Sequence, residues 1–161
     1  MTVFLTHMPS PVGNLTLAAR PGGLGGIYFE SHKHGGPLPG QAGASPVLDE
    51  ARRQLDAYFA GRRTRFDVPL APEGTPFQQR VWALLLRIPY GETVTYGWLA
   101  AQLDKPDAAR AVGAAVGRNP ISIIAPCHRV VGADGALTGF AGGIERKQWL
   151  LAHETAANRL I

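Results

Sequence analysis

The chain has 161 residues, a hydrophobic content of 45% and a net charge of +4, which is enough apolar material for one or two small domains with a buried core. No apolar run approaches the roughly 18 residues that span a bilayer, and residues 1–7 lack the pattern of a signal peptide. The single cysteine, Cys127, excludes an internal disulfide and a multi-cysteine zinc site. We therefore expect a cytoplasmic protein that does not enter a membrane.

The first third of the chain has the pattern of a small antiparallel sheet, because short apolar or alternating runs are separated there by turn-rich segments. The strands are expected over residues 2–7, 15–19 and 24–30. Residues 34–45 are rich in glycine and proline and predict a loop. Apolar residues at helical spacing then predict a helix from Pro46 to Gly61, which would cover one face of the sheet.

Three helices are predicted after a short connecting stretch. The first begins at Thr75, a capping residue followed by proline and then by glutamine three residues after the cap, and residues 89–91 end it. The second begins near Thr95, and after a tight break Asp107 is expected to cap the third, which runs to about Gly117. Two short helices joined by such a turn predict a helix-turn-helix.

The third helix consists almost entirely of alanine and glycine, although each interior glycine costs about 1 kcal/mol relative to alanine. Tight helix–helix packing is one interpretation, and close approach to a narrow DNA groove, with Arg110 as the one long side chain, is the other. The cations between residues 105 and 129 are Lys105, Arg110, Arg118 and Arg129, against the single acid Asp107. This excess suits a phosphate-contacting surface, but a solvated basic face fits the charge alone equally well.

Residues 121–125 predict a buried strand that leads to Cys127. A lone cysteine is more often an inert buried residue than a nucleophile, but a strand end, nearby cations and the adjacent His128 favour a reactive thiol. Neighbours on a regular element point in different directions, so His128 can act as a base only if a turn or a bridging water joins the two side chains. A structural role for His128 fits the spacing equally well. Spacing does not decide which acid would orient it, among Asp134, Glu145 and Glu154.

Several spaced motifs together resemble the O6-alkylguanine-DNA alkyltransferase family, nearly without gaps from Thr75 to Glu154. They are PFQQRVW at 76–82, PYGETVTY at 89–96, RAVG at 110–113, NP at 119–120, PCHRVV at 126–131 and KQWLLAHE at 147–154. The first half resembles the bacterial members more loosely, through SPVGNLTL at 10–17 and GGIYFE at 25–30.

The resemblance and the patterns together predict an α/β (α+β) fold. A small N-terminal antiparallel sheet with a covering helix is expected to precede a mainly helical C-terminal domain, which contains the helix-turn-helix and the active-site cysteine loop. The resemblance implies a structural, ribonuclease-H-like domain over residues 1–70 and a DNA-binding, alkyl-accepting domain over residues 75–161.

The activity that the resemblance implies is that of a methylated-DNA–protein-cysteine methyltransferase, a single-turnover DNA-repair protein. Cys127 would accept the alkyl group of O6-alkylguanine by in-line displacement, and activity on O4-methylthymine stays open. His128, working through a water with Glu154, would activate the thiol, and Asn119 would brace the turn before it. Tyr96 would help to rotate the nucleotide outward and donate a hydrogen bond to the leaving guanine.

The resemblance also implies binding of double-stranded DNA through the minor groove, where Arg110 would fill the space left by the flipped nucleotide. Flipping costs a few kcal/mol in lost stacking, which such a residue can offset. The other expected DNA contacts are Tyr96, Ala108, Ala109, Gly113 and Arg118.

The expected substrate pocket consists of Pro120, Val130, Phe140, Ala141 and Gly142. Phe140 stands where many relatives have tyrosine, so any contact from that hydroxyl is absent. Ala141 and Gly142 are small where some bacterial relatives have bulkier residues, which predicts a roomier pocket that tolerates adducts larger than methyl.

No metal or other cofactor is expected. Some relatives hold zinc in the N-terminal domain, but His7, His32 and His34 alone make a poor zinc site. The resemblance implies a monomer and leaves open whether several copies bind DNA cooperatively.

Three rival classes remain. A binding-only relative would lack the acceptor cysteine, and a helix-turn-helix transcription regulator would leave the cysteine segment without a purpose. A thiol hydrolase would take its histidine from elsewhere in the chain.

Overall fold

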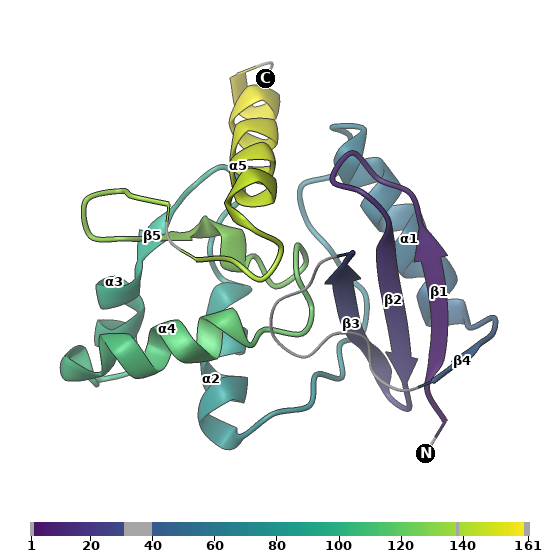
Figure 1. The fold of residues 1–161 in the computed structure, drawn as a ribbon, viewed down its shortest axis with the longest axis horizontal. Helices are drawn as coiled ribbons and strands as arrows, with labels where there is room; N and C mark the ends of the chain where they lie inside the picture. The colour runs from purple at the N-terminus through teal and green to yellow at the C-terminus, as the bar shows by residue number, and fades with distance from the viewer. Residues whose placement is uncertain (1, 31–39, 138, 160–161) are drawn as a thin grey trace.

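The computed structural model describes residues 2–30, 40–137 and 139–159. In Figure 1 the sheet and α1 (Pro46–Phe59) occupy one side of the molecule, and the helices α2 to α4 occupy the other. The last helix, α5 (Ile144–Arg159), stands above the junction between them. A single continuous hydrophobic cluster runs through both sides, from Leu15 in the sheet to Leu150 in α5. Within the described residues no helix is long and apolar enough to cross a membrane.

The predicted antiparallel sheet is confirmed. It consists of β1 (Phe4–Met8), β2 (Leu15–Arg20) and β3 (Gly23–Phe29), in which β2 pairs with both neighbours. A short fourth strand, β4 (Gln41–Ala42), extends the sheet and pairs parallel with β1. It lies in the stretch that was predicted to be a loop, of which residues 34–39 are outside the described residues. The helix α1 packs on the sheet as expected and ends two residues before Gly61.

The helix α2 (Pro76–Leu85) begins with the predicted capping box. The Thr75 hydroxyl accepts the Gln78 backbone N–H at 3.1 Å, and the Gln78 side chain accepts the Thr75 N–H at 3.0 Å. Both bonds satisfy donors that a helix start otherwise leaves free. The helix ends at Leu85, and the chain continues through turns to a two-residue strand, β5 (Val94–Thr95).

The helices α3 (Tyr96–Gln102) and α4 (Ala109–Gly117) pack against each other, as the helix-turn-helix prediction requires. The prediction that Asp107 caps the second of them is wrong. A short 3-10 turn, η1 (Pro106–Ala108), already contains Asp107, and Ala108 takes the cap position without a side-chain bond. Because Pro106 starts that turn, Asp107 has no extended backbone from which to cap a helix.

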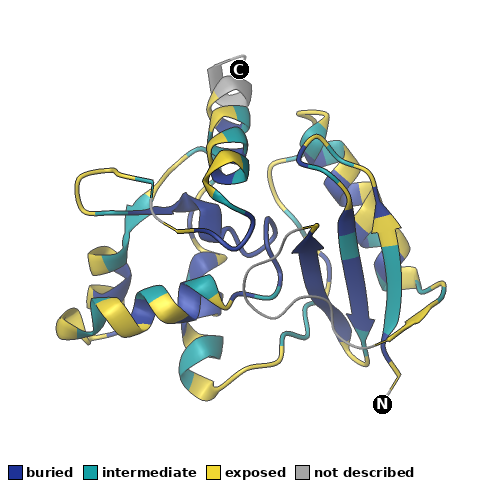
Figure 2. Cartoon of the chain, in the orientation of Figure 1, coloured by how far each residue is buried: buried dark blue, intermediate teal, exposed yellow. Residues whose placement is uncertain are grey.

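The predicted strand over 121–125 is also wrong, although its burial is confirmed. These residues form a buried turn, in which the Ala125 N–H donates to the Ile121 carbonyl at 3.0 Å and Ile123 has a φ of 76°. A left-handed conformation is unusual for a β-branched residue. Short apolar runs do not distinguish a strand from other buried structure, because burial alone determines their composition. In Figure 2 this segment, which follows α4, is coloured dark blue as buried.

Candidate active site

Cys127 begins a buried 3-10 turn, η2 (Cys127–Arg129), which follows directly after the buried segment. Two hydrogen bonds of Asn119 hold that segment closed: its side-chain N–H donates to the Ala125 carbonyl at 2.8 Å, and its carbonyl accepts the Ile121 N–H at 3.1 Å. The backbone N–H of Ile27 in β3 donates to the Pro120 carbonyl at 2.8 Å. The sheet and α4 therefore both fix where Cys127 lies.

A buried carboxylate lies beside this turn and is the centre of a hydrogen-bond network. Glu154 Oε2 lies 2.7 Å from His128 Nε2 and accepts the Tyr58 hydroxyl at 2.7 Å. Arg129 donates to both oxygens of Glu154, at 2.8 Å and 2.9 Å, and to the Ile88 carbonyl at 2.7 Å. The carboxylate on α5 is thus held by two other elements, α1 and η2. Of the three acids that spacing left open, the structure brings Glu154 to His128.

The protonation of this network follows from its burial and its charges. Although burial raises the pKa of Glu154, hydrogen bonds from His128 and Arg129 hold it below its ordinary value. Burial lowers the pKa of His128, so its ring is neutral at pH 7. Burial raises the pKa of the Cys127 thiol, and a hydrogen bond from Asn119 and the charge of Lys147 act against this rise. The resting site therefore holds a thiol, a neutral imidazole and a carboxylate.

Lys147 and Tyr58 belong to this site but escaped the sequence analysis. Lys147 is fully buried on α5, and its ammonium donates to the Val130 carbonyl at 2.6 Å. Tyr58 is one of the apolar residues whose helical spacing predicts α1, and nothing in the sequence assigned it a role in the site. A lysine between Arg146 and Gln148 gives little indication of burial, and no local pattern places an α1 tyrosine next to an α5 glutamate.

The prediction that Arg129 belongs to a phosphate-contacting surface is wrong. The Arg129 guanidinium is buried and occupied by Glu154 and Ile88, so it is not available to DNA. The other cations of that stretch, Lys105, Arg110 and Arg118, are exposed.

A cleft of about 680 Å³ runs along α4, and it brings together many of the residues expected to contact DNA and substrate. Its lining includes the predicted residues Tyr96, Ala109, Arg110, Gly113, Arg118, Phe140 and Ala141. A Cβ at Gly113 would lie 3.6 Å from the Tyr96 ring, which is an ordinary contact, so Gly113 lies directly against that ring. The bare face of α4 therefore forms the floor of a cleft.

The remaining predicted residues lie outside this lining. Cys127 is 5% exposed, and Val130, Asn119 and Gly142 are buried around it or behind Phe140. Phe140 packs against Phe29 of β3 with ring centres 5.5 Å apart. A Cβ at Gly142 would lie 2.6 Å from Phe29, so Gly142 permits this contact rather than enlarging the cleft. The half-buried residues Ala108 and Pro120 flank α4.

Within the described ranges no three histidine, cysteine, aspartate or glutamate side chains gather as metal ligands. His7 is exposed on β1, where its ring lies 3.0 Å from the Thr16 hydroxyl. His32 and His34 lie outside the described residues.

Comparison with known proteins places this geometry in a family. Residues 76–156 match the 6-O-methylguanine DNA methyltransferase, DNA binding domain, and residues 3–72 match the ribonuclease-like domain of the same proteins. The chain is 53% identical over 151 residues to the methylated-DNA–protein-cysteine methyltransferase of Mycobacterium tuberculosis, covering 90% of this chain and 88% of the relative. The chain belongs to the 6-O-methylguanine DNA methyltransferase family.

Similarity to this family extends to an archaeon and to a structure solved with DNA. The relative from Methanosarcina acetivorans is 51% identical over 146 residues, covering 90% of this chain and 94% of its own length. The fold superimposes on the Mycobacterium tuberculosis OGT, crystallised in complex with DNA, with a TM-score of 0.88 and 47% identity, covering 98% of this chain and 94% of that chain. The expected fold class and family membership are confirmed.

Proposed function

We propose that this methyltransferase repairs double-stranded DNA by moving the alkyl group of O6-alkylguanine onto Cys127 once, without regeneration. The observation that carries the proposal is the contact of His128 with Glu154, 2.7 Å apart, in the turn that begins with Cys127. A nucleophile next to a base that a third group orients is the arrangement expected for an activated thiol. The curated relatives carry the name of this activity.

The protonation states support a Cys127 side chain that stays a protonated, unreactive thiol until substrate arrives. Burial keeps the resting Cys127 protonated, and neutral His128 can accept its proton, through a water, at Nδ1. That nitrogen is buried and has no hydrogen-bond partner within the described residues, whereas Nε2 is engaged by Glu154. The carboxylate then stabilises the imidazolium.

The transfer itself is an in-line displacement at the alkyl carbon. The sulfur–carbon bond forms as the bond between carbon and O6 breaks, and the electron pair passes to guanine. Tyr96, at the edge of the cleft, donates a hydrogen bond as charge develops on the guanine. No described group is placed to hydrolyse the resulting thioether, so one transfer consumes the protein.

The cleft along α4 is the proposed DNA site. The backbone of α4 can approach the minor groove closely because its exposed face carries small side chains, and the exposed Arg110 replaces the nucleotide that rotates into the protein. Ala108, Ala109, Gly113 and Arg118 contact the DNA around it. Asn119 positions the acceptor, since it closes the turn between α4 and Cys127.

The small side chain of Ala141 at the cleft supports a tolerance for adducts larger than methyl. The variant Ala141→Leu is expected to slow transfer from O6-benzylguanine about tenfold, because added bulk acts against the larger adduct. Transfer from O6-methylguanine should change less than threefold, and equal losses for both adducts would contradict the assignment. Single-turnover rates with each adduct in the same duplex make the comparison.

The proposal includes two domains, residues 1–70 for support and 75–161 for DNA binding and transfer, acting as a monomer. The cytoplasm is the proposed place of action, because reducing conditions keep the only cysteine free.

The test is to incubate the protein with duplex DNA that contains O6-methylguanine, measure its intact mass and map the peptide that contains Cys127. One added methyl group per chain on that peptide, and none in Cys127→Ala, is expected. Binding without a mass change would instead indicate a binding-only reader. Turnover beyond one equivalent would contradict irreversible transfer.

A further inference from the structure

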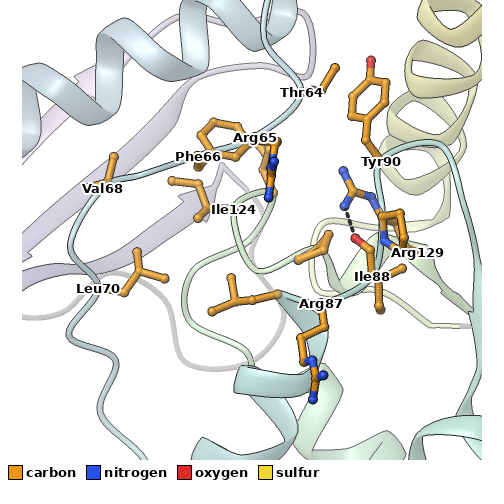
Figure 3. A pocket seen from close by; sticks show the side chains of 14 residues that line it. Thr64, Arg65, Phe66, Val68, Leu70, Arg87, Ile88, Tyr90, Ile124 and Arg129 are labelled. Atoms are coloured by element: carbon orange, nitrogen blue, oxygen red, sulfur yellow. Dashed lines mark hydrogen bonds between the residues drawn. The ribbon is translucent and has the colours of Figure 1, made fainter.

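A second cavity, of about 750 Å³, lies between the segment that follows α1 and the segments around Ile88 and Ile124 (Figure 3). It shares no lining residue with the cleft along α4. Cavities of about 300–1,000 Å³ between parts of a chain are where small organic ligands bind in proteins. The size of this cavity therefore fits a small molecule.

Three arginines and no acidic residue line the cavity, within the part of the chain that the structure describes. Arg129 is neutralised by Glu154. Arg65 and Arg87 are exposed, and their guanidinium groups form no hydrogen bond or ion pair with any described residue. They come from the two segments that face each other across the cavity. Because arginine is permanently charged, the lining carries two uncompensated positive charges.

The remaining walls are apolar or aromatic. Figure 3 shows Phe66 and Ile124 on one side of the cavity, and the lining also includes Leu86, which is 49% exposed. Tyr90 also lines the cavity, and its buried hydroxyl has no hydrogen-bond partner among the described residues. An unsatisfied buried hydroxyl is unusual, because such groups nearly always have a partner. The described lining thus combines apolar surface with arginine and hydroxyl groups and contains no carboxylate.

We propose that this cavity binds a small organic anion with an aromatic body. Arg65 binds the anionic group, Arg87 adds a second positive charge to the lining, and the apolar walls around Phe66 and Ile124 take up the ring. Pro126 and Arg129, on either side of the Cys127–His128 pair, belong to the same lining, so the ligand lies against the segment that carries the acceptor. The proposal does not depend on the alkyl-transfer assignment.

The probe that tests it is 8-anilinonaphthalene-1-sulfonate, whose fluorescence rises when its aromatic rings leave water. Titration into the full chain is expected to give one saturable site. The double variant Arg65→Gln/Arg87→Gln should bind at least about tenfold more weakly, because charge-assisted contacts are lost. Both arginines are exposed, so the variant should fold, which a thermal melt checks. Arg52→Gln, which removes an exposed arginine from α1 outside the lining, is the matched control and should leave the affinity unchanged.

Two further measurements separate this site from the alternatives. The uncharged N-phenyl-1-naphthylamine should bind at least about tenfold more weakly than the sulfonate, and unmodified duplex DNA should not displace the sulfonate. Absence of a saturable site, or equal affinity in the double variant, would overturn the proposal. Equal binding of the uncharged dye would reduce the site to an apolar groove, and displacement by DNA would place the dye in the cleft along α4. Either result also overturns it.

Discussion

The network around Glu154 and the cleft along α4 are built in opposite ways. In the network, Glu154 accepts hydrogen bonds from the tyrosine, histidine and arginine around it, and it is 1% exposed. In the cleft, α4 offers alanine and glycine with the exposed Arg110. One region is complete before DNA arrives, and the other leaves room for it.

Because of this difference, substitutions in the network and substitutions in the cleft should affect different properties of the protein. Removing one member of a buried, satisfied network leaves the other members unpaired, which destabilises the fold. Removing an exposed side chain that awaits a ligand costs the folded protein little. Stability and activation of the thiol should therefore respond to the network, and reaction with duplex DNA should respond to the cleft.

The largest expected effect is on the network. Glu154→Leu leaves Arg129, His128 and the Tyr58 hydroxyl without their acceptor, so the free energy of unfolding should fall by about 3–5 kcal/mol. Chemical denaturation measures it. Glu145→Leu, an exposed residue on the same helix, is the control and should stay within about 0.5 kcal/mol of the unsubstituted chain. Equal losses in both variants would mean that the network adds nothing to stability.

The cleft gives the next largest effect. Arg110→Ala should slow transfer from duplex O6-methylguanine about tenfold to a hundredfold, because nothing then offsets the few kcal/mol of lost stacking. Transfer from the free base O6-benzylguanine, which needs no flipping, should be unchanged. Single-turnover rates with both substrates check this, with the exposed Arg80→Ala on α2 as control. A loss on the free base as well would place Arg110 in the chemistry instead.

A substitution of Lys147 tests whether the charge of this buried residue, rather than its packing, lowers the pKa of the Cys127 thiol. Lys147→Met keeps the length of the side chain and removes the charge that lowers the pKa of Cys127. We expect the pH profile for reaction with free O6-benzylguanine to move up by about one unit, and the rate at pH 7 to fall about tenfold. The exposed Lys105→Met should leave the profile in place. An unmoved profile in Lys147→Met would reduce the residue to a packing role.

Acidification should give the smallest effect. Burial holds the pKa of His128 below its ordinary value of 6.5. Glu154 raises this pKa, whereas the charges of Arg129 and Lys147 lower it further. Below pH 6.5 the unfolded chain therefore binds a proton that the folded chain does not, and stability should fall by up to about 1.4 kcal/mol per pH unit. The contribution of Glu154 is lost only below its ordinary value of 4.5. Between pH 6.5 and 5 the effect therefore belongs to the histidine.

Thermal or chemical unfolding of the chain and of His128→Gln across that range measures the difference between the two slopes. The variant should lose part of the slope. Parallel slopes would show that His128 takes up its proton in the folded state as readily as in the unfolded one.

Local signals in the sequence predicted much of the fold. The capping box at Thr75 and the turn-separated runs before residue 30 depend on neighbouring residues, and the structure confirms both. The predictions for Asp107 and for residues 121–125 failed for different reasons. Pro106 starts a 3-10 turn that includes Asp107, so Asp107 cannot cap the helix. Residues 121–125 are apolar because they are buried in a turn, which the side chain of Asn119 closes. The division into domains 1–70 and 75–161 stays a prediction.

The sequence by itself determined the family and the acceptor candidate, because each motif is a short run of neighbouring residues that can be recognised without the fold. The motif at Cys127 contains both the thiol and the adjacent histidine. The sequence also identified α4 as a helix without bulk. The resemblance also implied Glu154 as the partner of His128, whereas spacing alone left Asp134 and Glu145 open. Only the tertiary structure decided that Arg129 is an interior partner of Glu154 instead of a DNA contact. It alone placed Tyr58 and Lys147 in the site. These contacts join residues that are 17 to 96 positions apart in the sequence, and a buried carboxylate needs donors from several directions, which only the folded core can bring together.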